Sequence, residues 1–307
     1  MKPIVILGVF VAGTAYRAAR QPKMGETLLG VDFKLGPGGK GSNQSVAAAR
    51  LGAPVHFITR LGRDDFAAMA MSTWQKAGVT PSVTETPESY TGAAYIFIEE
   101  NTGNNAIIVS PGAARLITPA DLDARADLIG SASIFMTQLE QPIDAAVRGL
   151  EIARAAGVTT ILNPAPGADI PDAMLGLSDY ATPNESEAEA LTGIAVKSLD
   201  TARAAAEALL VRGAGMAVIT LGENGVLLHG RGLSQHVPAF RIGKVVDTTG
   251  AGDAFNGGFA VGLARGMTPP QAARFGCAVA GISVTRPGTA PAMPSLEEAE
   301  ALLARGG

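Results

Sequence analysis

The sequence predicts an α/β protein of three layers, in which helices cover both faces of a doubly wound, mostly parallel sheet that carries a small antiparallel β lid. Short runs rich in Val and Ile alternate with helical patterns along most of the chain. Such alternation is typical of parallel strands joined by helical crossovers. Two stretches, 27–35 and 90–109, are strand-like without an intervening helix, and the turn signal ENTGNN at 100–105 predicts a hairpin in the second.

The individual elements follow from periodicity and from the residues that end helices. A glycine directly behind a helical pattern predicts a helix end, as at Gly52, Gly78 and Gly157. Two late helices, 251–265 and 270–284, are nearly uncharged, which predicts deep burial. The expected strands are 4–9, 55–60, 132–136, 159–163, 180–182 and 217–221. The other expected helices are 42–51, 64–77, 143–156, 185–192 and 201–211.

Length and composition restrict the possible functions. We expect one domain over 1–307, with a lid formed by about 25–36 and 90–110. The net charge of −4 and the lack of Lys/Arg runs argue against nucleic acid and membrane surfaces as partners. The single cysteine, Cys277, excludes an intramolecular disulfide and favours the cytoplasm. The apolar run 3–12 is short and broken by Gly8, so it indicates a buried first strand and not a signal peptide.

The segment DTTGAGDAFNGG, residues 247–258, places one carboxylate, Asp253, directly behind Gly250, Ala251 and Gly252. A near-apolar helix is expected to begin here, and free N–H groups at a helix start attract anions. Because no side chain at these three positions is larger than methyl, a phosphoryl group in transfer can lie on the backbone. Asp253 can then accept the proton of an attacking hydroxyl. The alternative, an ordinary acid on a helix dipole, does not explain the small residues.

The segment GPGGKGSNQ, residues 36–44, contains a G-x-G-x-x-G spacing but lies well after the first strand, where a dinucleotide fingerprint does not belong. It is not a Walker phosphate loop either, because Gly41 follows Lys40 in place of Ser or Thr. One reading is a flexible turn before a helix capped by Ser42. The other is a backbone that approaches a small ligand closely while Lys40 and Asn43 direct polar groups at it.

The segment TPNESEAEALTG, residues 182–193, places Asn184 at the start of an expected helix whose first turns carry Glu185, Glu187 and Glu189. In one reading these acids complement the helix dipole. In the other, Asn184 and Glu187 form the polar edge of a Mg²⁺–phosphate site, where one carboxylate acts through the waters that Mg²⁺ keeps. The residues alone leave both readings open.

Seven segments, taken in order, resemble the ribokinase family of PfkB-type carbohydrate kinases over essentially the whole chain. They are GGKGSNQ (38–44), QLEQP (138–142), NPAP (163–166), TPNESEAEALTG (182–193), ITLGENG (219–225), DTTGAGDAFNGG (247–258) and VTRPGTAP (284–291). Each is a weak signal alone, but their order and spacing are highly specific. The resemblance implies a ribokinase-like fold and an ATP- and Mg²⁺-dependent kinase that phosphorylates a primary hydroxyl of a pentose, most simply D-ribose at O5.

The resemblance also implies a role for each matching residue. The catalytic base would be Asp253, with an anion hole of Gly250, Ala251 and Gly252. The sugar pocket would be lined, beside Asp253, by Gly39, Lys40, Gly41, Asn43 and Glu140. The nucleotide would be bound by Asn184, Thr220, Gly222, Gly225 and Gly252, with Cys277 where a His often contacts the adenine. Mg²⁺ would be organised by Glu187. K⁺ or another activating monovalent cation would be bound by Asp247, Thr249 and the backbone of Ser283, Arg286 and Gly288.

Four positions depart from the family pattern, and one of them is Cys277, for which the alternative is a small buried apolar residue. Val11 and Gly13 stand where the family has an Asn and an Asp that bind sugar hydroxyls, and Ala292 stands where a Ser often completes the cation shell. A nucleoside or another sugar therefore remains an alternative substrate. A catalytically weak sugar-binding relative is a third hypothesis, against which the intact Asp253 argues. We also expect a homodimer formed through the lid, with sugar and ATP as its small-molecule partners.

Overall fold

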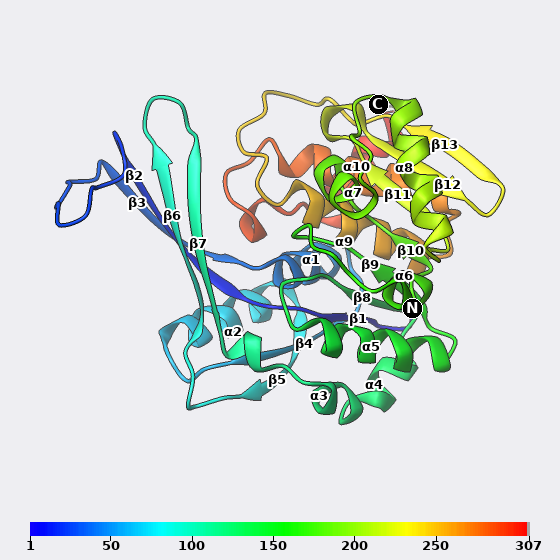
Figure 1. Ribbon diagram of the computed structural model, residues 1–307, viewed down its shortest axis with the longest axis horizontal. Coiled ribbons are helices and arrows are strands. Elements are labelled where there is room, and N and C mark those ends of the chain that lie inside the picture. The colour runs from blue at the N-terminus through cyan, green and yellow to red at the C-terminus, as the bar shows by residue number, and fades with distance from the viewer. Residues whose placement is uncertain (306–307) are drawn as a thin grey trace.

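The computed structural model describes residues 1–305, which form a large β-sheet with helices on both sides and a small β-sheet beside it (Figure 1). The strand order of the large sheet is β13-β12-β11-β10-β9-β8-β1-β4-β5. Pairing is parallel from β5 to β11, and β12 and β13 continue antiparallel at one edge. The strands are β1 (Ile4–Leu7), β4 (Val55–Leu61), β5 (Val79–Glu85), β8 (Ile134–Thr137), β9 (Thr159–Leu162), β10 (Tyr180–Ala181), β11 (Ala217–Thr220), β12 (Val226–Gly230) and β13 (Leu233–Val237). The predicted doubly wound sheet is confirmed.

Each face of the large sheet has its own apolar core. The first core contains side chains of α1 (Lys40–Arg50), α2 (Asp65–Ala77), α9 (Ala251–Ala264), α10 (Pro269–Ser283) and α11 (Leu296–Ala304). The second contains side chains of α3 (Pro119–Asp123), α4 (Ala126–Ser131), α5 (Ile143–Ala155), α6 (Asp172–Gly176), α7 (Glu185–Thr192) and α8 (Leu199–Val211). Helices α9 and α10 are buried over most of their length, as their lack of charge predicts.

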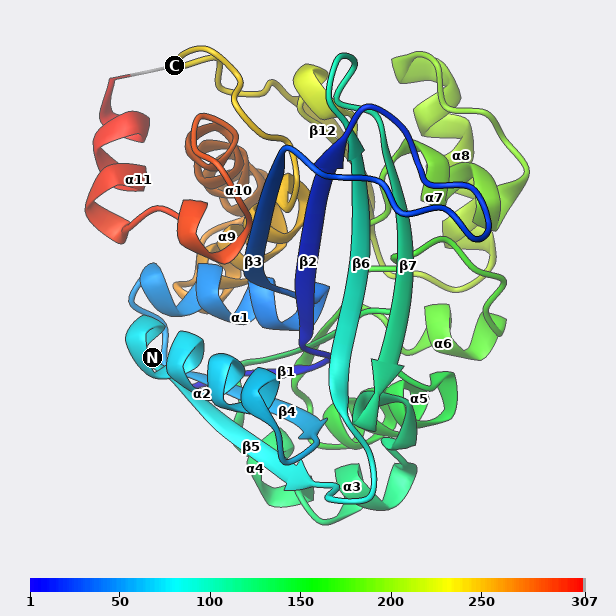
Figure 2. The same cartoon turned by 90° about the vertical axis from the view of Figure 1, so that its left-hand side faces the viewer.

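A four-stranded sheet stands beside this body (Figure 2). Its order is β3-β2-β6-β7, with β2 (Val11–Ala18), β3 (Asp32–Gly38), β6 (Thr91–Glu99) and β7 (Asn105–Gly112). The two outer pairs are antiparallel, whereas β2 and β6 pair in parallel. β6 and β7 form the hairpin that ENTGNN predicts.

The sequence-based boundaries of this small sheet need correction. The expected strand over 27–35 is wrong at its start, because residues 27–31 lie in a loop and β3 begins at Asp32. Strand β2 was not expected, since its sequence VAGTAYRA lacks a clear alternation of large apolar residues and both of its partners lie far along the chain. β5 was also not expected, because Pro81 and several polar residues interrupt its apolar pattern; Pro is tolerated there because β5 is an edge strand.

The two faces of the small sheet differ in chemistry. Strand pairing places Gly13 beside Gly36 and Ala94 on one face, which we call the inner face, and Ala15 beside Lys34 on the same side. The inner face lies toward the body, because the charge of Lys34 acts on Asp247 ahead of α9.

The opposite face, called the outer face, is rich in large apolar side chains. Tyr16 contacts Phe33, with 5.0 Å between ring centroids, and Tyr95 at 5.7 Å. Tyr16, Phe33 and Ile108 are 42%, 52% and 66% exposed. Exposed apolar groups gathered in this way are typical of an interaction surface.

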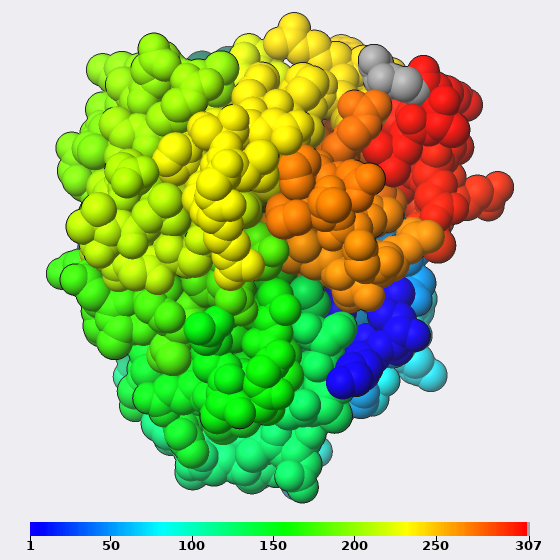
Figure 3. All heavy atoms as spheres, turned by 90° about the vertical axis from the view of Figure 1, so that its right-hand side faces the viewer, coloured from blue at the N-terminus to red at the C-terminus, as the bar shows by residue number. Residues whose placement is uncertain are grey.

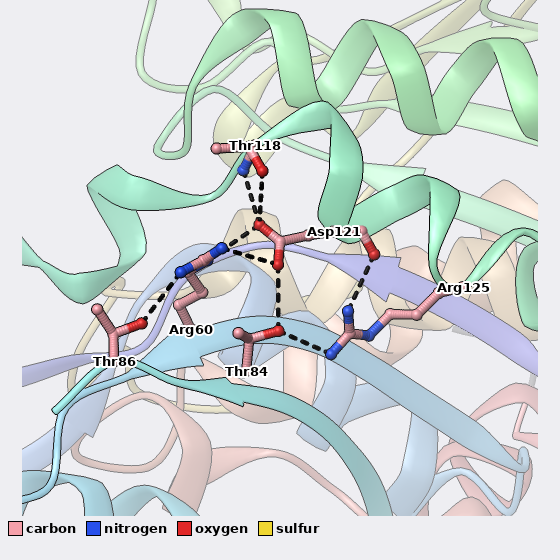
Figure 4. Close-up of polar contacts among 6 residues, drawn as sticks. All are labelled: Arg60, Thr84, Thr86, Thr118, Asp121 and Arg125. Atoms are coloured by element: carbon pink, nitrogen blue, oxygen red, sulfur yellow. Dashed lines mark hydrogen bonds and ion pairs between the residues drawn. The ribbon is translucent and has the colours of Figure 1, made fainter.

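A polar network joins the chain leaving the small sheet to the edge of the large one (Figure 4). Arg60 of β4 donates from Nε and Nη2 to the two carboxylate oxygens of Asp121, at 2.9 and 3.0 Å. Thr84 of β5 donates to Asp121 Oδ1 at 3.2 Å, and Arg125 donates to the Thr84 hydroxyl at 2.8 Å. Asp121 lies in α3, which follows β7 after a short 3₁₀ turn at Ala113–Leu116, so the network anchors the base of the small sheet.

Figure 3 shows the side of the molecule that faces away from the small sheet, where the segments drawn in green, yellow and orange form one continuous surface. None of the helices within residues 1–305 combines the length and the apolar character needed to cross a bilayer.

Candidate active site

The carboxyl ends of β8, β9 and β10 carry a row of buried polar groups. Gln138, Asn163 and Thr182 each come directly after one of these strands, and none is more than 6% exposed. Ligands of doubly wound sheets bind beyond this edge. Helices α1 and α9 both begin here, because Gln44 of α1 contacts Asn163 as well as Asp253 of α9.

The start of α1 depends on two glycines. Gly39, the N-cap, has φ of 91°, and a Cβ there would lie 2.4 Å from the carbonyl oxygen of Val9. A Cβ on Gly41 would lie 2.7 Å from the Cα of Gly8 at the end of β1. The segment 36–44 therefore brings the helix start against the end of β1.

Helix α1 begins at Lys40, so the reading in which Ser42 caps it is wrong. The Gly39 cap has no side-chain hydrogen bond. Ser42 lies inside the helix and accepts a hydrogen bond from Trp74 Nε1 at 2.9 Å. The Lys40 N–H donates to Glu140 Oε2 at 2.7 Å, so a side chain of the neighbouring loop occupies part of the helix start.

Helix α9 begins with the three small residues of the GAG segment. Gly250 is the N-cap, with φ of 78° and no side-chain cap. The Ala251 N–H donates to the Thr248 carbonyl at 3.1 Å, so this amide is already engaged. A Cβ built on Gly252 would meet no heavy atom of residues 1–305 within 4 Å. The first-turn amides of Gly252 and Asp253 have no acceptor inside an α-helix, so they remain for an anion beside this open space.

Asp253 is a buried carboxylate that two amides orient. Asn43 donates from Nδ2 to Oδ2 at 2.9 Å, and Gln44 donates from Nε2 to Oδ1 at 3.1 Å. Burial raises the pKa of Asp253, while the charge of Lys40 and the two amide donors oppose the rise. A raised pKa makes this carboxylate a stronger proton acceptor.

Lys40 is the cation of a small charge cluster. Burial opposes its charge, but Asp253, Glu140 and Glu187 together raise the pKa of Lys40 above its ordinary value. Burial raises the pKa of Glu140 to about 7, against the Lys40 N–H and the Lys40 charge. Burial likewise raises the pKa of Glu187, against the hydrogen bond from Asn184 and the charge of Lys40. The structure thus brings together Lys40, Asn43, Glu140, Glu187 and Asp253.

Asn184 and Glu187 form a capping box at the start of α7. The Asn184 side chain accepts from the Glu187 N–H at 2.8 Å, and Glu187 Oε2 accepts from the Asn184 N–H at 2.9 Å. The capping box accounts for the positions of Asn184 and Glu187 at the helix start. The carboxylate of Glu187 keeps further lone pairs, so the Mg²⁺–phosphate reading of this segment stays a prediction.

The turn after β11 lies beside this helix start. Thr220 ends β11, and its N–H donates to the Pro183 carbonyl at 2.9 Å. Gly222 and Gly225 have φ of 52° and 94°. A Cβ on Gly222 would lie 3.8 Å from Glu185 Oε1, which places the turn and the start of α7 side by side.

A model of the pfkB family of carbohydrate kinases matches residues 4–296 of the chain. The chain belongs to this family. It is therefore an ATP-dependent sugar kinase, as the order of its segments predicts, and the β-sheet edge described above is the candidate site of phosphoryl transfer.

Relatives of this kinase cover nearly its whole length. It is 36% identical to a ribokinase of Haemophilus influenzae over 97% of both chains. It is also 36% identical to a deoxyribokinase of Salmonella typhi over 96% of both chains. A ribokinase of Arabidopsis thaliana complexed with ribose and ATP superposes with a TM-score of 0.95 at 29% identity, over 98% of both chains. A ribokinase of Thermotoga maritima gives a TM-score of 0.90 at 35% identity, covering 99% of this chain and 100% of the other.

The loop predicted to bind a monovalent cation is closed around Asp247. This carboxylate accepts from the Thr249 N–H at 2.9 Å and from the Gly288 N–H at 3.0 Å. Although burial opposes its charge, these bonds and the charge of Lys34 keep the pKa of Asp247 below its ordinary value. Ser283 is the last residue of α10, and its carbonyl accepts from the Arg286 N–H at 3.1 Å. The predicted cation ligands of the kinase therefore lie in two segments, 247–249 ahead of α9 and 283–288 at the end of α10, which the hydrogen bond from Gly288 to Asp247 joins.

Cys277 is a buried residue of α10. Its side chain is 5% exposed and belongs to the apolar core on this face of the sheet, and burial raises the pKa of its thiol to about 12, against the charge of Arg274. These properties fit the alternative in which Cys277 is a small packing residue, and its contact with adenine stays a prediction.

Sequence reasoning missed the uncharged polar residues around Asp253, namely Gln44, Gln138, Asn163, Thr182 and Asn256. One signal was available. Gln138, Asn163 and Thr182 each interrupt an apolar run at the end of an expected parallel strand, the edge where such a sheet binds its ligands.

Proposed function

We propose that the kinase transfers the γ-phosphate of ATP to the primary hydroxyl of a pentose, D-ribose in the simplest case, giving ribose 5-phosphate and ADP. One observation carries the proposal: the buried carboxylate of Asp253 lies at the start of α9, beside first-turn amides that border open space. Proton acceptor and anion site thus belong to consecutive residues.

In this proposal Asp253 accepts the proton of the sugar hydroxyl as the hydroxyl oxygen bonds to the γ-phosphorus. The bond from that phosphorus to the bridging oxygen breaks, and ADP leaves with the electron pair. The amides of Gly252 and Asp253 stabilise the transferring phosphoryl group. Asn43 contacts Asp253, and Glu140 contacts the backbone of Lys40. Both are proposed to bind the sugar from the side of α1.

Asn184, Thr220, Gly222 and Gly225 form the proposed nucleotide site, because the start of α7 and the turn after β11 lie side by side. Glu187 fits a Mg²⁺ site because it supplies a hard carboxylate oxygen next to the phosphate position. Mg²⁺ would supply charge neutralisation on the phosphates. The oxygen-rich site formed by Asp247, Thr249, Ser283, Arg286 and Gly288 suits K⁺, and Ala292 provides no hydroxyl for it.

The small sheet is proposed to act as the lid, with its inner face over the sugar. Its outer face is proposed to form a homodimer, since Tyr16, Phe33 and Ile108 are exposed together. Sedimentation velocity tests this: Phe33→Glu is expected to give a monomer if the face is the interface. The kinase is proposed to work in the cytoplasm, where ATP is available and a single thiol stays reduced.

A second candidate substrate, 2-deoxy-D-ribose, is favoured by the inner face of the small sheet. Val11 and Gly13 offer no hydroxyl-binding group there, and a Cβ on Gly13 would lie 3.4 Å from Ile96 Cδ1, an apolar neighbour. The 36% identity to a deoxyribokinase of Salmonella typhi supports this second candidate.

An ADP-release assay tests the proposed function directly. D-ribose, 2-deoxy-D-ribose, hexoses and nucleosides are each added to the protein with ATP and Mg²⁺, and phosphorus NMR identifies the product. A pentose 5-phosphate supports the proposal. ADP formation with nucleosides alone, or with none of these compounds above the rate without acceptor, contradicts it.

A further inference from the structure

The buried polar residues around Asp253 form a closed circuit of hydrogen bonds. Gln44 donates from Nε2 to Asp253 Oδ1 at 3.1 Å and to Asn163 Oδ1 at 3.0 Å. Asn163 donates from Nδ2 to the Thr182 carbonyl at 2.9 Å. The Thr182 hydroxyl donates to Asn256 Oδ1 at 2.6 Å.

Asn256 closes the circuit by donating from Nδ2 to the Gly252 carbonyl at 2.9 Å, one peptide bond away from Asp253. The circuit joins the ends of β9 and β10 to the starts of α1 and α9, and all of its side chains are at most 6% exposed. It therefore connects the carboxylate of Asp253 with the backbone of the proposed anion site.

The side-chain amide of Gln44 makes three hydrogen bonds in this network. Its two amide hydrogens have two acceptors, Asp253 and Asn163, and its oxygen accepts from Gln138 Nε2 at 2.6 Å. A flipped amide would place the Gln44 oxygen against two other oxygens and its NH₂ group against that of Gln138. The hydrogen-bond pattern thus permits one orientation, and Gln44 is 0% exposed, so water cannot replace its bonds.

We propose that Gln44 is a positioning residue of the kinase, which holds the Asp253 carboxylate in register with the Gly252–Asp253 peptide group through this circuit. The inference deepens the proposed function and rests on it. A proton acceptor displaced by a fraction of an ångström loses much of its effect, because phosphoryl transfer depends on alignment of the attacking hydroxyl. A purely structural glutamine would instead contribute to stability alone.

Gln44 also sets the proton affinity of the base, because a donor to a carboxylate favours its charged form. Three charged groups also act on Asp253: Lys40 of α1, Glu140 in the loop after β8, and Glu187 of α7. Gln44→Met leaves all three in place and removes one donor from Asp253. The pKa of Asp253 should then rise by about one unit.

The chain offers a matched control in Gln141. It is also buried, at 4% exposed, and its amide donates to Thr137 Oγ1 at 2.9 Å and to the Gln138 carbonyl instead of to Asp253. Gln44→Met and Gln141→Met each remove one buried amide and keep the side-chain length. They are expected to lower stability comparably, and only the first should change the chemistry.

The experiment measures kcat/KM for D-ribose between pH 5 and 9 at saturating ATP and Mg²⁺. Gln44→Met is expected to move the acid limb up by about one pH unit and to lower kcat about tenfold. Gln141→Met should leave the pH profile unchanged. Carbon-13 NMR of labelled aspartate, with Asp253→Asn for assignment, reads the pKa of Asp253 without catalysis. No turnover with any sugar would contradict the proposed function, whereas an unchanged pKa of Asp253 in Gln44→Met would contradict this inference. The two failures are thus distinguishable.

Thr182→Val provides a second route if Gln44→Met does not fold. It keeps the side-chain shape, breaks the circuit at Asn256 and leaves both donors of Asp253 intact. We expect kcat to fall severalfold with an unchanged acid limb. The inference is overturned if both variants keep kcat within twofold of wild type, or if Gln44→Met and Gln141→Met give the same pKa of Asp253.

Discussion

Asn43 donates a hydrogen bond from Nδ2 to Oδ2 of Asp253 at 2.9 Å, between residues that lie 210 positions apart in the chain. The bond joins the first turn of α1, which Asn43 closes, to the first turn of α9. Asn43 belongs to the helix proposed to bind the sugar, and Asp253 belongs to the helix whose start is proposed to bind the phosphate. The bond therefore links the two proposed binding sites.

The first prediction concerns Asp253→Asn. Asn is nearly isosteric and suits a helix start, so the fold and ATP binding should be kept. Turnover should fall at least about 10²-fold, the usual effect of losing a positioned base. Steady-state kinetics and nucleotide titration by calorimetry check this. Turnover within threefold of wild type would remove Asp253 from the mechanism.

The second prediction concerns the pH dependence of stability. The folded protein raises the pKa of Glu140 from 4.5 to about 7, chiefly by burial. The folded state therefore holds a proton that the unfolded state has lost, and stability falls as the pH rises from about 4.5 to 7. The loss is about 3 kcal/mol. Below pH 4.5 Glu140 is protonated in both the folded and the unfolded state, so its ionisation does not lower the stability there.

Glu140→Gln should remove this dependence. Urea unfolding at pH 4.5 and 7.5 is expected to show the variant gaining about 3 kcal/mol relative to wild type at the higher pH. The exposed Glu88→Gln is the control and should show no such gain. A constant difference between Glu140→Gln and wild type at both pH values would contradict the role of burial.

The third prediction concerns lid closure. Hydrogen exchange in β2, β3 and the β6–β7 hairpin should slow when a verified sugar substrate is added, because a closed lid protects the γ-phosphate from water. The β12–β13 hairpin at the far edge of the large sheet serves as an internal reference. Equal exchange of the small sheet with and without substrate would refute closure.

The fourth prediction concerns Gly13→Asp. A Cβ at this position has ordinary contacts, 3.4 Å to Ile96 Cδ1 and 3.6 Å to the Gly36 carbonyl, so the strand can accept the side chain. Charged hydrogen bonds to sugar hydroxyls contribute about 1.5–3 kcal/mol each, so kcat/KM for D-ribose should rise at least about tenfold. Ala15→Asp, two residues along the same face, is the control. No gain with Gly13→Asp would mean that this pocket binds its sugar through other groups.

Local signals were enough for much of this fold. The uncharged sequence of α9 predicted its burial, and Gly78 predicted the end of α2. Strand β2 could not be predicted, because it is stabilised by pairing with β3 and β6 and not by its own small residues. The same holds for the site. Asp253 is singled out as the one acid of its motif. Asn256 belongs to the same segment, but its partner Thr182 lies 74 positions away, and no local pattern encodes that contact.

The parallel pairing of β2 with β6 has a consequence for how this molecule assembles. Between these strands the chain passes through α1, β4, α2 and β5, all parts of the body. The small sheet therefore consists of segments that are separated in the chain by elements of the body, so it is not expected to fold as an autonomous unit. Its contacts close long loops, so they raise the contact order of the fold, a property that slows folding. Excision of residues 91–112 would expose β2 as an unpaired edge, a known route to aggregation.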